Sequence, residues 1–173
     1  MPDYDLTGKH VLILGAETEV GRAVANAVTD AGAHVALIAA TGDAEAAFAV
    51  QRLARRLASP DRKVISQAID ATNEMAVRVM ARQVSKELGG LGAVVFCSDF
   101  GDRTAAAIDL AVLFSNREFA RRGGGTFIAA VPRETHAGLD EMPSGNTTLT
   151  VRPAEDVAET ATNVVEAIAG GSQ

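Results

Sequence analysis

The sequence predicts an α/β fold in which one doubly wound parallel sheet of about six strands carries helices on both faces. Short, continuously apolar runs alternate with longer amphipathic runs along the chain. This alternation implies parallel strands joined by right-handed helical crossovers, and continuously apolar strands are typical of a sheet covered on both faces. Aromatic residues make up only 4% of the chain and alanine is abundant, which favours closely packed helices over a β-sandwich. We expect the strand order 3-2-1-4-5-6.

Each expected strand is a short apolar run, and most expected helices are bounded by capping or glycine residues. Strands are expected over 10–14, 34–39, 63–69, 93–97, 126–131 and 147–151. Helices are expected over 20–31, 43–58, 72–88, 104–122 and 154–169. Asp43 is placed to cap the second helix, and Gly32 and Gly89 follow helix ends as stop signals. The last strand alternates Thr with aliphatic residues, so we expect it to be a half-buried edge strand.

Composition predicts one soluble, cytoplasmic domain. The 173 residues suffice for one core, and 47% of them are hydrophobic, which argues against disorder. The formal net charge is −6 and the basic residues are scattered, so we expect no nucleic-acid partner. We expect no membrane association, because no signal pattern begins the chain and no apolar run approaches the ~20 residues of a membrane helix. Cys97 is the only cysteine, so no internal disulfide is possible.

The opening segment reads LTGKHVLILGAETEVGRAVANAVTDAGAHVALIAAT and resembles the first βαβ unit of a short-chain dehydrogenase/reductase. The resemblance covers residues 6–97 and returns in RRGGGTFIAA and in RPAEDVAETATNVVEAI. Three separated matches in chain order make the resemblance specific, whereas a bare glycine-rich loop would not. It implies a single Rossmann-like domain over residues 1–173, in a family whose cofactor is NAD or NADP.

The family binds its dinucleotide through a T-G-x-x-x-G-x-G turn, which corresponds to LGAETEVG here. The resemblance assigns Gly15, Glu19 and Gly21 to a degenerate cofactor site, with Glu19 in place of the middle glycine. That glycine lets the backbone approach the pyrophosphate at the helix N-terminus, so an anionic side chain obstructs and repels it. Glu17 adds a second carboxylate. Two unit charges ~4 Å apart repel by about 4 kcal/mol at an effective dielectric near 20, or about a thousandfold in affinity.

Two interpretations of these acids remain open. Either they decorate the helix start, where a carboxylate contributes ~0.3–1 kcal/mol through the helix dipole, or Glu19 occupies the anion site itself. Both predict weak binding, so we expect no cofactor, or NAD or NADP if the site still binds. At the end of the second strand, Ala39 and Ala40 supply neither the acid nor the base that relatives use there. Asp70 stands where relatives contact the adenine edge, although a turn and capping role is the simpler alternative.

The catalytic residues of the family are absent from this sequence. Relatives use a Tyr-x-x-x-Lys pair on one helix and a serine after the fifth strand; the tyrosine is the acid or base, and the lysine lowers its pKa and holds the ribose. Here the only tyrosine is Tyr4, which lies before the first expected strand, and the last lysine is Lys86, which lies before the fourth. The sequence therefore contains no Tyr-x-x-x-Lys pair. Ala129 or Ala130 takes the serine position. We therefore expect no catalytic residue.

Residues 132–146 stand where relatives carry the helix with the Tyr–Lys pair. Their prolines and glycines predict an irregular loop. In relatives that helix also helps to build a subunit interface, and the seventh strand that usually follows the last helix is missing here as well. The acidic residues and the histidine of this segment are best explained as solvated side chains of a polar loop, so we expect no metal site. The residues in question are Glu134, His136, Asp140 and Glu141.

Three functions are compatible with these observations. The favoured one is a non-catalytic relative that serves as a structural or regulatory subunit, in a homo-oligomer or beside an active dehydrogenase paralogue. The second is an NAD(P)-dependent oxidoreductase with an atypical active site that uses Asp99, Asp109 or a residue of the 132–146 loop. A nucleophilic Cys97 is less plausible, because no histidine is placed beside it. The third is a nucleotide or small-ligand sensor that keeps an adenine pocket near Asp70.

Overall fold

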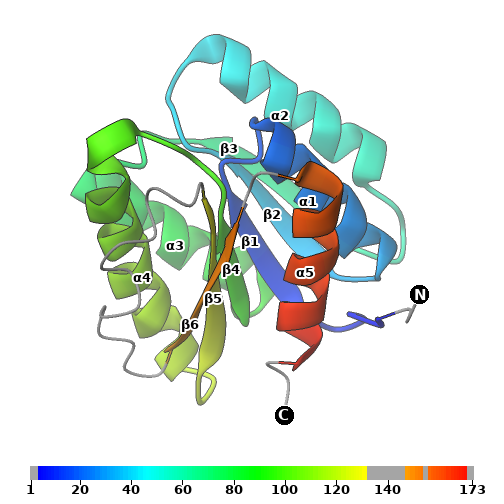
Figure 1. Ribbon diagram of the computed structural model, residues 1–173. Helices are drawn as coiled ribbons and strands as arrows, with labels where there is room; N and C mark the ends of the chain where they lie inside the picture. Colours follow the sequence, from blue (N-terminus) through cyan, green and yellow to red (C-terminus); the bar gives the residue numbers. More distant parts are fainter. Residues whose placement is uncertain (1–3, 132–146, 154–155, 171–173) are drawn as a thin grey trace.

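The computed structural model describes residues 4–131, 147–153 and 156–170. One six-stranded sheet has the order β3-β2-β1-β4-β5-β6, with helices on both of its faces (Figure 1). Every pair of neighbouring strands is parallel. The predicted fold class and strand order are therefore confirmed.

The elements lie close to their expected ranges. The strands are β1 His10–Leu14, β2 His34–Ala39, β3 Val64–Ala68, β4 Ala93–Phe96, β5 Gly125–Val131 and β6 Thr147–Pro153. The helices are α1 Glu19–Asp30, α2 Ala44–Leu57, α3 Glu74–Leu88, α4 Thr104–Ala120 and α5 Val157–Gly170. A short 3-10 helix, η1 Gly101–Arg103, precedes α4 and was not expected. The largest difference is at α5, which begins at residue 157 rather than 154.

Side-chain caps fix where the helices begin. The side chain of Asp43 caps α2, as expected, and accepts a hydrogen bond from the Glu45 N–H. The side chain of Asn73 caps α3 by accepting from the Ala76 N–H, so this helix begins two residues later than the expected position 72. Gly89 ends α3 in the left-handed region, with φ 83°, which a glycine adopts without strain.

Alternate strand residues feed two separate core layers, as a sheet covered on both faces requires. In β1, Val11 and Ile13 pack on the side of α1, α2 and α5, and Leu12 and Leu14 pack on the side of α3 and α4. All four side chains are fully buried. Figure 1 shows α1 and α5 on one face of the sheet and α3 and α4 on the other.

The outer edge of the sheet next to β5 is formed by β6. Within the described residues β6 pairs with β5 alone, in agreement with the expected edge position. The expected irregular loop, 132–146, lies outside the described residues. In the described part of the chain, no helix combines the length and the apolarity that crossing a membrane requires.

Candidate functional site

The candidate site is the turn between β1 and α1, at the carboxyl end of the sheet. The chain passes from β1 outward to β2 and β3 and then returns to place β4 on the other side of β1. Ligands bind at such a switch point in open α/β sheets. The N–H groups of Gly15 and Ala16 donate to the Ile38 carbonyl at 2.8 and 3.1 Å. The Thr18 hydroxyl donates to the Gly15 carbonyl at 2.7 Å and accepts from the Gly21 N–H at 2.9 Å. The turn thus satisfies much of its own hydrogen bonding and caps α1.

Gly15 and Gly21 are required by packing alone. Gly15 has φ +101°, and a Cβ built on it would lie 2.4 Å from the Ser98 Oγ. A Cβ on Gly21 would lie 2.1 Å from the Gly15 carbonyl oxygen. Any larger residue would therefore force the turn and α1 apart, whether or not a ligand binds. The two glycines of the family motif that remain are those that the fold itself needs.

Glu19, which replaces the middle glycine, is the exposed first residue of α1. In dinucleotide-binding turns the middle glycine serves the close approach of the pyrophosphate, whereas the outer two serve the turn and the packing of the helix. No hydrogen bond among the described residues engages the Glu19 carboxylate. This favours a helix-start role for Glu19 over occupation of the anion site by its own carboxylate. The position that changed is therefore the one that serves a ligand.

The Glu17 side chain leaves the turn and reaches the neighbouring strand. Its Oε1 accepts a hydrogen bond from the Ala40 N–H at 3.1 Å, directly after the end of β2. Its charge also reaches Cys97, where it adds to the effect of burial in raising the pKa of the thiol. A carboxylate therefore lies near the ends of β2 and β4. No local pattern predicts this contact, because it joins residues 23 positions apart.

The residues directly after β4 are a buried thiol, Cys97, and a buried hydroxyl, Ser98. Cys97 is buried, and burial raises the pKa of its thiol far above the usual range, which keeps it protonated and unreactive. Ser98 is 3% exposed, and its hydroxyl has no hydrogen-bond partner within the described residues. Sequence reasoning overlooked Ser98, although its place directly after Cys97 at a strand end was a usable signal. Its hydroxyl packs directly against Gly15 at the start of the turn.

Two other carboxylates considered from the sequence have different surroundings. The Asp99 Oδ1 accepts from the Gly101 N–H at 2.9 Å and from the Thr104 hydroxyl at 3.1 Å. These bonds form the turn that begins η1, which explains the unexpected 3-10 helix. Asp109 is exposed on α4. Asp99 therefore has a role in its own turn, and a part for either carboxylate in proton transfer remains a prediction.

Asp70 is exposed and is engaged in its own turn. Its Oδ1 accepts from the Thr72 N–H at 2.9 Å and from the Thr72 hydroxyl at 2.6 Å. The hydrogen bond from the Thr72 hydroxyl is the main cause that holds the pKa of Asp70 below its ordinary value, and the hydrogen bond from the Thr72 N–H is the next. The local turn role is therefore present, and contact of Asp70 with an adenine remains a prediction.

Tyr4 and the lysines lie at the opposite, amino end of the sheet. Tyr4 precedes β1 and packs against the core beside α1, where the Leu6 N–H donates to the Ala31 carbonyl at the end of that helix. The three lysines of the sequence precede strands or end a helix at this same edge: they are Lys9, Lys63 and Lys86. The turn at Gly15 lies at the carboxyl edge. Neither the tyrosine nor a lysine therefore lies beside the turn among the described residues; the cation at the turn is Arg22, whose Nη1 donates to the Glu17 carbonyl at 3.0 Å.

The serine position is apolar as well. Ala129 and Ala130 lie in β5 and are buried in the two core layers, one on each face of the sheet. In the described part of the chain, His, Cys, Asp and Glu form no group of three or more that could hold a metal ion. The polar cluster expected in the 132–146 loop lies outside that part.

The family model described as short chain dehydrogenase matches residues 9–110. The chain belongs to the short-chain dehydrogenase family. A short-chain type dehydrogenase/reductase from Mycobacterium marinum has 30% sequence identity and a TM-score of 0.63, over 78% of this chain and 58% of that one. Glycine betaine reductase ATRR from Emericella nidulans is 33% identical over 98 residues, which cover 57% of this chain and only 7% of that protein.

Two solved structures of lower sequence identity share the fold over nearly the whole chain. Hydroxysteroid dehydrogenase from Escherichia coli has 13% identity and a TM-score of 0.78, over 96% of this chain and 92% of that one. A short chain dehydrogenase from Burkholderia cenocepacia J2315, in complex with NADP, has 19% identity and a TM-score of 0.69 over 96% and 94%. At these identities the likeness establishes the fold and nothing further.

Proposed function

We propose that this domain is a non-catalytic member of the short-chain dehydrogenase family that serves as a structural or regulatory subunit of an oligomer. The observation that carries the proposal is the separation of Tyr4 from the turn at Gly15. A hydride-transfer site needs a proton donor within hydrogen-bond reach of the reacting oxygen. The one tyrosine of the sequence lies at the other edge of the sheet, and so do all of its lysines.

The cofactor turn supports the same proposal from the side of binding. Glu19 supplies a carboxylate at the position that serves pyrophosphate approach, and the Glu17 carboxylate lies at the end of β2. The helix N-terminus attracts an anion, but two carboxylates close by oppose that attraction. NAD and NADP both carry a negative pyrophosphate, so the turn disfavours both cofactors.

The partner in this proposal is a second copy of the chain or an active dehydrogenase paralogue. The edge strand β6 supports an assembly role, because within the described residues its outer side pairs with no other strand. An unpaired strand edge is a template for pairing with another chain. Size-exclusion chromatography with light scattering, followed by pull-down, tests this part: a strict monomer that captures no dehydrogenase-like partner would contradict it.

Calorimetric titration with NAD and NADP tests the binding part. We expect affinities far weaker than micromolar for the wild-type protein, and a gain of roughly a hundredfold or more in the Glu17→Gln/Glu19→Gly variant, because each removed charge takes away a repulsion of a few kcal/mol. Glu159→Gln/Glu166→Gln on α5 removes two exposed carboxylates elsewhere and serves as the matched control. Micromolar binding of either cofactor by the wild type would overturn this part.

The family relationship favours a second candidate, an NAD(P)-dependent oxidoreductase with an atypical active site. The match over residues 9–110 includes the whole nucleotide turn, and the outer glycines keep its shape. This candidate requires a new acid or base, for which Asp99 and Asp109 are the carboxylates considered. Turnover that is lost on Asp99→Asn or Asp109→Asn would favour it over the non-catalytic role.

A further inference from the structure

We propose that a cavity between α3 and α4 binds a small multivalent anion that carries phosphate or carboxylate groups. The cavity has a volume of about 270 Å³ and is lined by Arg78, Arg82, Phe114, Arg117, Glu118 and Arg121. It lies on the face of the sheet opposite α1 and α5 (Figure 1). The site goes beyond the proposed function and does not depend on whether the nucleotide turn binds a cofactor.

The four arginines come from two neighbouring helices as two pairs. Arg78 and Arg82 lie one turn apart on α3, and Arg117, in the last turn of α4, lies one turn before Arg121, the residue that follows this helix. Like charges at this spacing repel and destabilise a helix, so helix stability does not explain the pair on α3, whereas the helix dipole also favours cations at the carboxyl end of α4. All four cations are arginines, whose planar guanidinium groups bind carboxylate and phosphate through two parallel hydrogen bonds. The residue choice and the convergence both favour an anionic ligand.

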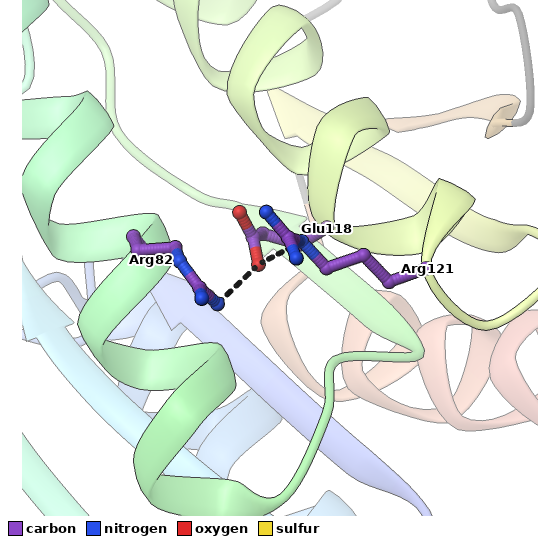
Figure 2. A network of polar contacts seen from close by, with 3 residues as sticks. All are labelled: Arg82, Glu118 and Arg121. Carbon is purple, nitrogen blue, oxygen red and sulfur yellow. Dashed lines mark ion pairs between the residues drawn. The ribbon is translucent and has the colours of Figure 1, made fainter.

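Glu118 positions two of these guanidinium groups without using their hydrogen bonds fully. Its side chain is 6% exposed, and its Oε1 lies 3.5 Å from the Arg82 Nη1 and 3.4 Å from the Arg121 Nε (Figure 2). These are ion-pair distances, longer than the ~2.7–2.9 Å of a charge-assisted hydrogen bond. Accordingly, this oxygen has no hydrogen-bond partner within the described residues. The two guanidinium groups are held at the cavity wall and keep donors for a ligand.

The other two arginines leave the cavity strongly positive. Neither Arg78 nor Arg117 forms an ion pair within the described part of the chain, and the Arg117 guanidinium lies over the Phe114 ring, 5.0 Å from its centroid. Stacking on an aromatic ring orients a guanidinium and leaves the donors at its edge available. With one carboxylate among four arginines, the lining has a formal excess of three positive charges. This excess is concentrated in a chain whose net charge is −6.

The volume limits the ligand to a small anion. Pockets for drug-sized ligands range from ~300 to 1,000 Å³, and this cavity lies just below that range. A pyrophosphate group or a small tricarboxylate fits such a volume, whereas a whole dinucleotide does not. Phosphate and carboxylate present the same paired oxygens to a guanidinium group, so the two sources are separated by experiment.

Isothermal titration calorimetry with pyrophosphate and with citrate, at constant ionic strength, tests the site. We expect saturable binding of at least one probe, at one site per chain, weakened by about tenfold or more in Arg78→Gln/Arg117→Gln because two charge-assisted contacts are lost. Arg82 and Arg121 are kept, because removing either would leave the buried Glu118 with one partner fewer. Arg52→Gln/Arg55→Gln, two exposed arginines of α2, is the control with the same change of charge.

Binding of pyrophosphate alone identifies a phosphate site, and binding of citrate alone identifies a carboxylate site. Binding of both supports the shared chemistry. The proposal is overturned if neither probe binds saturably, if Arg78→Gln/Arg117→Gln binds as tightly as the wild type, or if the α2 control loses the same affinity. The Glu17→Gln/Glu19→Gly variant keeps this site intact, so failure here is distinguishable from failure of the proposed function.

Discussion

The Glu17 Oε1 accepts a hydrogen bond from the Ala40 N–H at 3.1 Å and joins the turn after β1 to the end of β2. In relatives the end of the second strand is where an acid contacts the adenosine ribose or a base contacts a 2′-phosphate. Here the carboxylate comes from the neighbouring turn instead. The same side chain therefore connects the turn to β2 and gives the turn a negative charge. That charge lies where a 2′-phosphate would otherwise be expected.

Replacing Glu17 with Gln should improve NADP binding more than NAD binding. The amide oxygen of Gln can still accept from the Ala40 N–H, so the turn is kept while its charge is removed. We expect about a tenfold gain for NADP and less for NAD, because the 2′-phosphate adds negative charge near this position. Calorimetry measures both, with Glu166→Gln as control. Equal gains for the two cofactors would contradict this placement.

Replacement by alanine should destabilise the protein at Gly21 and leave its stability nearly unchanged at Glu19. A Cβ on Gly21 would lie 2.1 Å from the Gly15 carbonyl oxygen, so Gly21→Ala should lower the free energy of unfolding by about 1–3 kcal/mol. Glu19→Ala changes an exposed side chain and should stay within about 0.5 kcal/mol of the wild type. Urea denaturation measures both. A Gly21→Ala variant as stable as the wild type would show that this glycine is not retained for packing.

The Cys97 thiol should resist modification in the folded protein. Burial raises its pKa, and only the thiolate reacts rapidly with thiol reagents. Labelling with an aromatic disulfide reagent should be slow in native buffer and fast in denaturing urea. Fast labelling without denaturant would mean that the thiol is accessible and would reopen a catalytic role for it.

His10 should make the fold less stable below neutral pH. Burial lowers the pKa of His10, and Arg122 and His34 nearby lower it further, against the opposing hydrogen bond from its Nδ1 to the Gly90 carbonyl. The unfolded side chain has a pKa of about 6.5, so below that pH the unfolded chain binds more protons than the folded one. The stability present above about pH 6.5 is therefore lost as the pH falls through the lower, folded pKa.

Urea denaturation of the wild type and of His10→Gln at about pH 7.5 and about pH 5.5 measures this loss. The wild type should lose more of its free energy of unfolding than the variant over this interval. The acids with lowered pKa values, Asp5 and Asp70, are common to both proteins and titrate at lower pH. An identical loss in both proteins would rule out His10 as the cause.

The fold was predictable because its signals are local. Continuous apolar runs mark strands such as β1 and β2. Asp43 marks the start of α2 and Gly89 the end of α3, and each acts on residues within one helical turn of itself. The start of α3 was misplaced because Asn73 caps that helix, whereas Asp70 bonds within its own turn. Both residues are plausible caps in the sequence, and only the backbone geometry decides between them.

The site was predictable only in part. The replacement at Glu19 is visible in the sequence, because the motif has a fixed spacing. The contact between Glu17 and Ala40, and the cavity around Glu118, join residues of different elements through tertiary packing. No periodicity or spacing reports such contacts. The reason for keeping Gly21 was also hidden, because it depends on how closely α1 approaches the Gly15 carbonyl.

Oxidation of NADH or NADPH in the presence of a broad panel of carbonyl compounds tests the central claim most directly. The cofactor is used at a concentration high enough to saturate a weak site, so that chemistry rather than affinity limits the reaction. With Tyr4 and every lysine at the amino edge of the sheet, no cofactor should be consumed above the protein-free rate. Consumption that rises in proportion to the protein concentration, with a matching yield of alcohol, would contradict a non-catalytic role.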